Sequence, residues 1–365
     1  MSERATTSDV SAGLAGPVEV VGAGLIGTSI ALACRRAGVD VLLSDTSAEH
    51  LRTASGLGAG RAKEAEDVAA LVVVAVPPDH LGDAVVAALD AAGEDTVVTD
   101  VGSVKAAPLA HVTGHPAASR YVGSHPMAGS ERSGPLAASA DLFTGRPWAV
   151  CRHDGASATA VRRVAALVEV CGAVAVMLTP AEHDKAVART SHVPHLLASL
   201  VAGTLAGAAP EHLALTGQGV RDVTRVAAGD PVLYSQIIGG NSDAVAGLLR
   251  EVRSRLDLAL DAVADGDRAG LESLLAHGLA GTRAIPGKHG GPVQAVSAVH
   301  VAVPDHPGEL ARLFADVGAS GVNIEDVRID HDPGRPVGLV ELDVAVGRAE
   351  HLLAALESRG WVAHR

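Results

Sequence analysis

Short apolar runs alternate with amphipathic stretches through the first half of the chain. Residues 18–38 combine an apolar run, a glycine-rich turn and a stretch of helical periodicity. Further apolar runs that predict strands are 39–45, 70–77, 96–103, 146–151 and 173–178. Strands that are hydrophobic throughout and separated by helices are typical of a parallel sheet covered on both faces. The pattern therefore predicts an α/β domain with a doubly wound sheet.

The pattern changes after the last of these runs, and the remainder divides in two. Residues 180–284 are rich in Ala and Leu at helical spacing, which predicts an all-helical domain. Residues 285–294 are rich in Gly and Pro and predict a linker. Residues 295–365 follow the order strand, helix, strand, strand, helix, strand, which is ferredoxin-like. We expect residues 1–16 to be a flexible tail and the first domain to span 17–179.

Composition and charge narrow the class of protein. A chain of 365 residues that is 48% hydrophobic and 19% charged suits two or three globular domains. The net charge of -13 argues against nucleic acid or an anionic membrane as a general partner, although a local cluster of Arg and His can still bind an anionic substrate.

The termini, apolar runs and cysteines indicate the compartment. The chain shows no signal-peptide pattern and no apolar stretch of membrane-spanning length, so we expect a cytoplasmic protein. Its cysteines, Cys34, Cys151 and Cys171, are widely spaced and odd in number, and they offer neither a disulfide framework nor a zinc pattern.

The turn "GAGLIG" places Gly22, Gly24 and Gly27 in a G-x-G-x-x-G pattern between an apolar strand and a helix. Such glycines allow close approach of a pyrophosphate to the backbone, and the helix N-terminus supplies N–H groups. Asp45 ends the next strand, where a carboxylate binds ribose hydroxyls and repels a 2′-phosphate, which favours NAD over NADP. The alternative is a strand–helix corner whose glycines serve packing only. The predicted cofactor-binding residues of this Rossmann-type domain are Gly22, Gly24, Leu25, Ile26, Gly27, Asp45, Val76, Pro77 and Ser103.

The segment "GSHPMAGSERSG", residues 123–134, has no period of a helix or a strand and is predicted to be a loop that carries His125. A dehydrogenase needs a base to take a hydroxyl proton as hydride leaves, and histidine has a suitable pKa. His125 is expected just past a short apolar strand, and Ser103 and Lys105 just past another. Ser103 could hydrogen-bond the imidazole or the substrate hydroxyl. The alternative for His125 is a loop histidine with a structural role.

Several segments together carry a resemblance to a known family. They are "GAGLIGTS", "TDVGSVK", "GSHPMAGSERSG", "SHVPHLLA" and "RDVTRVAAGDPVLYSQI". In combination they resemble prephenate dehydrogenase, the tyrosine-biosynthesis enzyme, and its close relative arogenate dehydrogenase. The resemblance covers residues 17–285 and implies oxidative decarboxylation: hydride passes to the nicotinamide of NAD while the ring carboxylate leaves as carbon dioxide. It also implies that His125 is the catalytic base with Ser103 as its hydrogen-bonding partner.

The segment "SHVPH" opens the predicted helical domain. Ser191 and His195 are one helical turn apart and therefore share a face. His192 and His195 are spaced three apart, which occurs in metal sites, but no third ligand or H-E-x-x-H pattern accompanies them, so we expect no metal. The resemblance implies that His195 and Ser191 line the substrate pocket.

The remaining predicted substrate contacts also come from the resemblance. Arg225 matches the family arginine that holds the side-chain carboxylate of the substrate, which a guanidinium fork fits well. Asp222 is expected to orient the pocket, Glu131 to join an ionic network that gates it, and Arg221 to be a solvated helix charge. Tyr234 stands where many family members carry tryptophan, which keeps an aromatic wall but changes the shape of the pocket.

The C-terminal segment "VPDHPGELARLFADVGASGVNIEDV" resembles an ACT domain, a small regulatory fold that binds amino acids between paired copies. Asp305 and Gly308 lie at the first strand–helix junction, Asn323 is expected to open the second strand, and Ile324 follows it. The resemblance implies that these residues bind an effector, with tyrosine, the end product of the pathway, as the first choice. Phenylalanine, no ligand, or a purely dimerising domain remain alternatives.

Rival functions remain at this point. The β-hydroxyacid dehydrogenases also join a Rossmann-type domain to a helical one, but their catalytic lysine sits in a glycine/asparagine pattern that Lys185 lacks. A regulator that binds NAD and an amino acid without catalysis would not need His125, Ser103 and Arg225 together. We therefore expect an NAD-dependent prephenate dehydrogenase that forms a homodimer through its helical domain. The choice between prephenate and arogenate stays open.

Overall fold

The computed structural model divides the chain into two compact units, residues 1–257 and 258–365, and each is described by itself. The described residues are 14, 16–129, 132–285, 295–331 and 337–365. Most of the predicted tail, almost all of the predicted linker, and Glu131 lie outside them. The predicted domain boundaries stay predictions.

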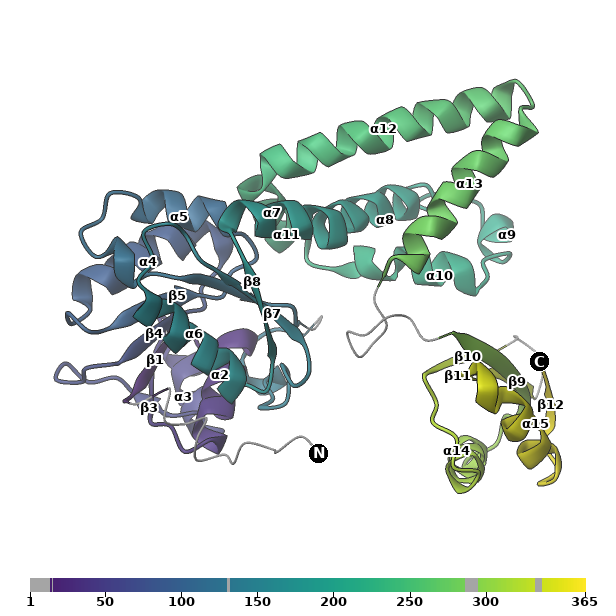
Figure 1. Cartoon of the computed structure of the whole chain (residues 1–365), viewed down its shortest axis with the longest axis horizontal. Coiled ribbons are helices and arrows are strands. Elements are labelled where there is room, and N and C mark those ends of the chain that lie inside the picture. The colour runs from purple at the N-terminus through teal and green to yellow at the C-terminus, as the bar shows by residue number, and fades with distance from the viewer. Residues whose placement is uncertain (1–13, 15, 130–131, 286–294, 332–336) are drawn as a thin grey trace. The chain divides into compact units, whose positions relative to one another are not determined.

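A five-stranded sheet forms the centre of the N-terminal part, and all its neighbouring strands are parallel. Its order is β3-β2-β1-β4-β5 (Figure 1). The strands are β1 (Val18–Val21), β2 (Val41–Ser44), β3 (Arg61–Ala62), β4 (Leu71–Val74) and β5 (Val97–Asp100). The parallel sheet that the sequence predicts is confirmed for these strands, which place their carboxyl ends at one edge.

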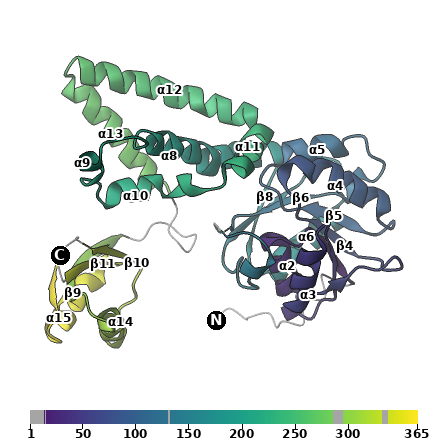
Figure 2. The ribbon, with the colours of Figure 1, turned by 180° about the vertical axis from the view of Figure 1, so that it is seen from behind.

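Alternate residues of these strands enter two separate cores. Val73 packs with Ile30 of one helix and Leu167 of another, whereas Val72 packs with Leu81 and its neighbours on the opposite face. Figure 2 shows these helices from behind. They are α2 (Leu25–Arg36), α3 (Ala48–Gly56), α4 (Pro78–Ala91), α5 (Ala106–Val112) and α6 (Ala158–Val170). Since helices cover both faces, the strands can be apolar on both sides.

A second sheet has three strands and corrects two expectations. Its strands are β6 (Gly123–Pro126), β7 (Pro147–Cys151) and β8 (Val174–Leu178). Strand β6 runs antiparallel to β7, so the domain is not parallel throughout. His125 lies within β6 and pairs with Ala149 of β7, so the prediction that it follows a strand was wrong. Ser124 and His125 are polar, so the sequence pattern did not indicate a strand there. The strand forms because its hydrogen bonds to β7 outweigh its weak local preference for strand structure. Short 3-10 turns flank it at η1 (Ala118–Arg120) and η2 (Pro135–Ala137).

Helices follow β8, and the described residues 180–285 contain no strand. Thr179 begins the first of them with a capping box that includes Glu182. A π-helical turn, η3, connects the first two long helices. The helices and turns are α7 (Pro180–Val187), η3 (Ala188–His192), α8 (Val193–Gly203), α9 (Pro210–Leu213), α10 (Gln218–Thr224), η4 (Arg225–Ala228), α11 (Pro231–Gly240), α12 (Ser242–Ala264) and α13 (Arg268–Arg283). Ala188, Val193 and Val245 form the centre of a small apolar core there.

The C-terminal segment forms a four-stranded antiparallel sheet in the order β10-β11-β9-β12. Its elements are β9 (Val296–Pro304), α14 (Glu309–Ala319), β10 (Asp326–His331), β11 (Val337–Ala345), η5 (Val346–Arg348), α15 (Ala349–Glu357) and β12 (Val362–His364). Alternate strand residues such as Val301 and Val340 pack with Leu313 of α14 and Leu352 of α15. The order of the strands and long helices is the expected one, and the ACT assignment stays a prediction.

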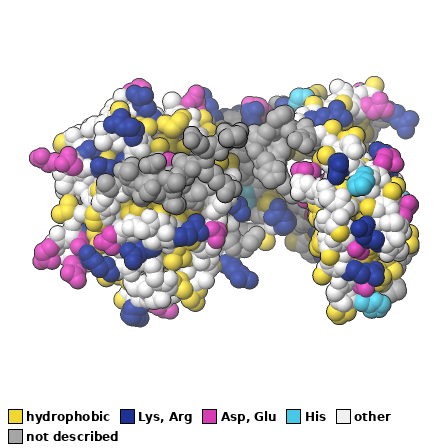
Figure 3. Space-filling view, turned by 60° about the horizontal axis from the view of Figure 1, so that its bottom comes forward, with side chains coloured by type: hydrophobic (Ala, Val, Ile, Leu, Met, Phe, Trp, Pro, Cys, Tyr) yellow, Lys and Arg dark blue, Asp and Glu magenta, His cyan; other side chains and the backbone are white. Residues whose placement is uncertain are grey.

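Acidic and basic side chains are interspersed in the space-filling view (Figure 3). Among the described residues, no helix is long and apolar enough to cross a membrane.

Candidate active site

A cavity of about 700 Å³ lies at the carboxyl ends of the parallel strands. It is bordered by the turns after β1, β2, β4 and β5 and by one side of α11. Predicted cofactor-binding residues that line it are Gly22, Gly24, Ile26, Asp45, Val76, Pro77 and Ser103. In open α/β sheets ligands bind at this edge, so the position of the cavity suits a nucleotide.

The glycines of this turn allow close packing of the backbone and leave room for a ligand to approach it. Gly22 has a φ of 102°, and a Cβ there would lie 2.4 Å from the carbonyl oxygen of Ala75. A Cβ at Gly27 would lie 1.9 Å from the carbonyl oxygen of Gly22, so this glycine permits close packing of helix and strand. A Cβ at Gly24 would meet no protein atom within 4 Å. The three glycines therefore play different parts: two shape the turn, and Gly24 keeps the cavity open.

Helix α2 begins at this turn without a side-chain cap, because its N-cap residue is Gly24. Its first N–H groups are therefore available to an anion. Asp45 is held beside the turn: its carboxylate accepts hydrogen bonds from the backbone N–H of Ala23 at 2.6 Å and of Ser47 at 2.7 Å. An anion-binding turn next to an oriented carboxylate fits the pyrophosphate and ribose of a dinucleotide.

Two of the predicted cofactor residues do not line the cavity. Leu25 is half-buried at the start of α2, and Gly27 is buried against β1. Sequence reasoning missed His50 on α3 and Leu233 and Ile237 on α11, which do line it. The α11 residues lie more than 200 positions from the glycine turn, and no local pattern joins them to it.

His125 belongs to a cluster that its own segment does not reveal. Its Nδ1 lies 2.9 Å from Nε2 of His183 on α7, and the two rings meet edge to face. Nδ1 of His183 lies in turn 2.8 Å from Oδ1 of Asp184. Sequence reasoning missed His183 and Asp184, although the adjacent pair in "EHDK" was a visible signal.

Asp184 also anchors the start of α5. Its carboxylate accepts hydrogen bonds from the backbone N–H of Lys105 and of Ala106, each at 2.8 Å. Burial by itself raises the pKa of Asp184, but the hydrogen bonds from His183 and from these two amides outweigh it and hold the pKa below its ordinary value. The carboxylate is therefore ionised at neutral pH.

The imidazole of His125 is kept neutral. Burial lowers its pKa well below the ordinary 6.5, and the nearby His183, Lys105 and His192 add to the effect when they are charged. Because the neutral form is the one that accepts a proton, His125 suits the part of a general base over a wide range of pH.

Lys105 and Asp100 form a fully buried ion pair below this cluster. The hydroxyl of Tyr121 donates to Asp100 at 2.7 Å, and so does the backbone N–H of Gly102, at 2.9 Å. These bonds fix the turn after β5, which carries Ser103 to the edge of the nucleotide cavity. The hydrogen bond that the structure gives to His125 goes to His183, and pairing of Ser103 with His125 stays a prediction.

His195 and Tyr234 come together as a stacked pair, with ring centroids 3.5 Å apart and planes 9° apart. Burial lowers the pKa of His195, and its Nδ1 is buried without a hydrogen-bond partner. Ser191 lies in the π-helical turn η3, half-buried, one turn before His195. The aromatic wall expected at Tyr234 is therefore in contact with the "SHVPH" segment.

Arg225 is exposed at the start of η4, and Arg221 is exposed on α10. Both elements pack against α8, so they lie next to the helix that carries His195. Asp222 is exposed and accepts a hydrogen bond from Gln218 of its own helix at 2.9 Å. Glu131 lies outside the described residues, so its proposed ionic network stays a prediction.

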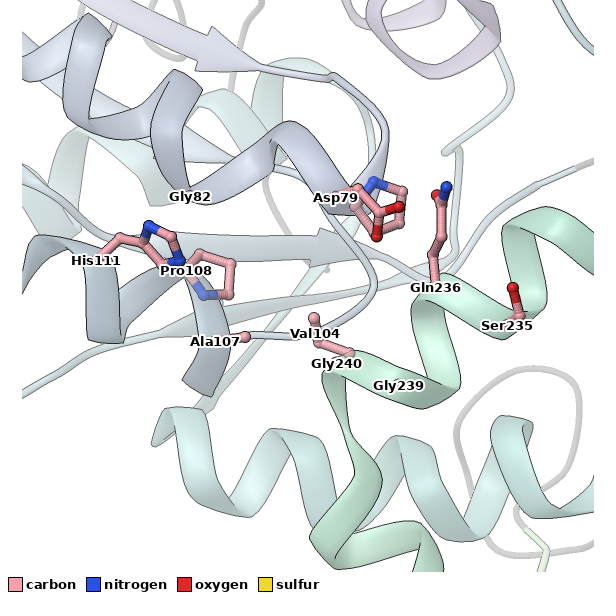
Figure 4. A pocket seen from close by; sticks show the side chains of 11 residues that line it. Asp79, Gly82, Val104, Ala107, Pro108, His111, Ser235, Gln236, Gly239 and Gly240 are labelled. Carbon is pink, nitrogen blue, oxygen red and sulfur yellow. The ribbon is translucent and has the colours of Figure 1, made fainter.

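A second cavity of about 380 Å³ lies between α11 and the helices α4 and α5. Figure 4 shows Ser235 and Gln236 on α11 and, across from them, Asp79 and His111. His111 is within 3.2 Å of the carboxylate of Asp83. None of the predicted site residues lines this cavity, and we assign it no role.

In the C-terminal unit, Gly308 is the N-cap of α14 with a φ of 94°, a conformation that favours glycine. Asp305 is exposed, and Ile324 packs partly buried against the core. Asn323 does not open the second strand as predicted, because β10 begins at Asp326. Instead its amide donates to the carboxylate of Glu325 at 2.9 Å, a local bond typical of a turn.

Comparison with known proteins relates the chain to one family. Residues 30–185 match the prephenate dehydrogenase nucleotide-binding domain, and residues 179–277 match the prephenate dehydrogenase dimerization domain. A Streptomyces niveus protein named "Probable prephenate dehydrogenase NovF" is 38% identical over 94% of this chain and 98% of its own. Prephenate dehydrogenase of Bacillus subtilis is 30% identical over 85% of this chain and 87% of its own. The crystal structure of prephenate dehydrogenase from A. aeolicus with hydroxyphenyl propionate and NAD+ is 25% identical, covers 73% of this chain and 97% of that chain, and has a TM-score of 0.66.

Proposed function

The chain belongs to the prephenate dehydrogenase family and is an NAD-dependent enzyme, and we propose that it converts prephenate to 4-hydroxyphenylpyruvate in tyrosine biosynthesis. The observation that carries the proposal is a neutral, half-buried His125 in the same domain as a glycine-lined dinucleotide cavity. Oxidation of a ring alcohol requires a base and a hydride acceptor. His125 is the proposed base, and the cavity is the proposed site for NAD, the hydride acceptor.

NAD, when bound, supplies the hydride acceptor. His125 takes the proton of the ring hydroxyl as the hydride leaves, and its lowered pKa keeps it ready to do so at neutral pH. Ser103, at the edge of the cavity, orients the hydroxyl or the imidazole. Loss of carbon dioxide and aromatisation of the ring drive the reaction, so positioning is the main task of the remaining residues.

The substrate's side-chain carboxylate is assigned to Arg225, whose guanidinium can bind it through two parallel hydrogen bonds. His195 and Ser191 form the adjacent wall, and Tyr234 covers the imidazole of His195. The unpartnered Nδ1 of His195 supports this assignment, because a buried ring nitrogen without a partner is costly and a bound carboxylate or hydroxyl would satisfy it. Asp222 and Glu131 are proposed to shape the charge of this pocket.

Arogenate is the alternative substrate. It carries an ammonium group where prephenate has a keto oxygen, so a carboxylate facing the side chain would favour it. Glu131 is the candidate for such a carboxylate. The same base and the same arginine serve both substrates.

The C-terminal residues 295–365 are proposed to be an ACT regulatory domain that binds tyrosine as a feedback inhibitor. Its four-stranded sheet with two helices supports the assignment. Asp305, Gly308, Asn323 and Ile324 are the proposed contacts, near the N-terminus of α14 and the turn before β10.

A cytoplasmic homodimer is the proposed form of the enzyme. The match of residues 179–277 to a dimerization domain supports it. Apolar side chains that are exposed in the single chain, including Leu200 and Val201 on α8 and Val223 on α10, would be covered in such a dimer.

The test is NADH formation by the purified full-length enzyme with prephenate and, separately, with arogenate, each with and without tyrosine. Turnover of prephenate that tyrosine inhibits supports the whole proposal. Turnover of arogenate alone keeps the base and Arg225 and changes the substrate. Turnover of neither contradicts the proposed function. If tyrosine changes neither the rate nor the thermal unfolding midpoint of an active enzyme, it is not the effector.

A further inference from the structure

His183 and Asp184 stand behind His125 and have no part in the function proposed above. We propose that His183, held by Asp184, is a positioning residue that fixes the tautomer of His125 and leaves Nε2 of His125 free to accept the substrate's proton. The inference rests on the proposed function, in which His125 is the base.

The direction of the first hydrogen bond follows from Asp184. This carboxylate is only 5% exposed, and it accepts the backbone N–H groups of Lys105 and Ala106. An ionised carboxylate has no proton to donate. Nδ1 of His183, 2.8 Å away, must therefore carry a proton and donate it to Oδ1 of Asp184.

The direction of the second hydrogen bond follows from the first. A neutral imidazole protonated on Nδ1 has an unprotonated Nε2, which can only accept. Nε2 of His183 lies 2.9 Å from Nδ1 of His125, so Nδ1 of His125 donates to a neutral His183. This leaves the lone pair of His125 on Nε2. In the opposite arrangement Nε2 would carry the proton, and the imidazole could not act as a base through that atom.

Neighbouring bonds hold the chain of groups in place. His183 is 1% exposed, and its ring meets that of His125 edge to face with the centroids 5.1 Å apart. The side-chain amide of Asn241 donates to the backbone carbonyl of Asp184 at 2.7 Å, which ties α7 to the end of α11. A ring held in this way cannot turn to offer its other nitrogen without breaking a buried hydrogen bond.

Asp184 also balances charge during the reaction. As the hydroxyl proton moves to Nε2, His125 becomes an imidazolium whose Nδ1 still donates to His183. Lys105 and, when it is protonated, His192 oppose that positive charge. The carboxylate of Asp184 lies one ring away from His125 and stabilises the imidazolium through His183.

Two substitutions separate positioning from structure. His183→Phe removes the acceptor for Nδ1 of His125, and we expect kcat to fall on the order of 100-fold, with the KM for substrate and the Kd for NAD unchanged. In His183→Gln the amide oxygen reaches about as far from the main chain as Nε2 does, so this variant should recover part of kcat. His153→Phe is the matched control, because His153 bonds to the backbone carbonyl of Tyr121 in the same domain and has no part in the cluster.

The tautomer itself is measured in long-range proton–nitrogen correlation spectra of the full-length enzyme labelled with 15N-histidine. His125→Asn identifies the signals of His125 by their loss. We expect the Nδ1-protonated form in the wild type. His125 protonated on Nε2 in the wild type would overturn the inference, and so would a His183→Phe enzyme as active as the wild type. If the wild type turns over neither prephenate nor arogenate, the proposed function fails, whereas the tautomer measurement still stands.

Discussion

The nucleotide cavity and the histidine cluster are built in opposite ways. Most of the cavity comes from the turns that follow the parallel strands β1, β2, β4 and β5, and Gly22, Gly24 and Gly102 are among its lining residues. The cluster joins β6, α7 and the turn before α5, and its members, His125, His183 and Asp184, mean little in their own segments. The comparison teaches that the cavity proposed for the cofactor rests on backbone shape, whereas the proposed base depends on side chains that only the tertiary structure brings together.

The largest expected effect is on the cluster. His125→Asn should lower turnover on the order of 10²- to 10⁴-fold, because it removes the general base. The amide nitrogen of Asn lies close to the former position of Nδ1 and can still donate to His183, so the fold should be kept. Turnover is followed as NADH formation, and the affinity for NAD by titration calorimetry. Loss of both turnover and NAD binding would show that His125 shapes the cavity, and the contrast between the two regions would then break down.

A second effect concerns how folding stability changes with pH at His192, a buried histidine near the cluster. Burial lowers the pKa of His192 to about 4, and its Nδ1 lies 3.2 Å from the amide nitrogen of Asn241. The unfolded chain binds the proton near pH 6.5, whereas the folded chain binds it only near pH 4. Folding stability is therefore lost as pH falls from 6.5 towards 4, by about 2 kcal/mol at pH 5.

Urea unfolding at pH 7.5 and pH 5.0 measures this loss. His192→Asn, whose amide oxygen can accept from Asn241, serves as the reference because it does not titrate in this range. The wild type should lose more stability than the variant between the two pH values. Equal losses would mean that His192 is not held neutral by burial.

The next effect tests the backbone of the cavity. Gly24→Ala should raise the Kd for NAD about tenfold, or about 1.4 kcal/mol, because the new methyl group projects into space reserved for the ligand. The unfolding midpoint should not fall, since that Cβ meets no protein atom within 4 Å. Gly56→Ala at the end of α3 is the control, because its Cβ also meets nothing within 4 Å. Unchanged NAD affinity in Gly24→Ala would argue that the pyrophosphate lies elsewhere.

The smallest effect tests the choice of cofactor. Asp45→Asn keeps an acceptor for the backbone N–H groups of Ala23 or Ser47 but removes the charge that repels a 2′-phosphate. The preference for NAD over NADP in kcat/KM should fall on the order of fivefold, about 1 kcal/mol, which is the scale of one hydrogen bond. Asp40→Asn, an exposed carboxylate paired with Arg35, changes the net charge equally and should leave the ratio as it is. A wild type that uses both cofactors equally would contradict this role of Asp45.

Prediction from the sequence succeeded where the signal is local. The apolar runs predicted every strand of the five-stranded sheet except the two-residue β3. The turn "GAGLIG" predicted the position of the cavity. Both predictions use patterns of hydrophobicity or glycine spacing that extend over only a few residues. It failed at β6, whose polar residues hid a strand, and at Asn323, which lies before a strand rather than in it. His195 and Tyr234 were each predicted, but their stacking was not.

The sequence by itself determined the α/β domain followed by helices and the glycine turn, and it proposed His125 as the base. Those features depend on short-range sterics, hydrophobic period and residue chemistry. Only the tertiary structure decided which groups surround that base. His183 lies 58 positions from His125 along the chain. The contact between the two side chains depends on how α7 packs beside β6 and β7. A hydrogen bond over such a separation forms because packing positions the two backbones, and no spacing rule along the chain records it.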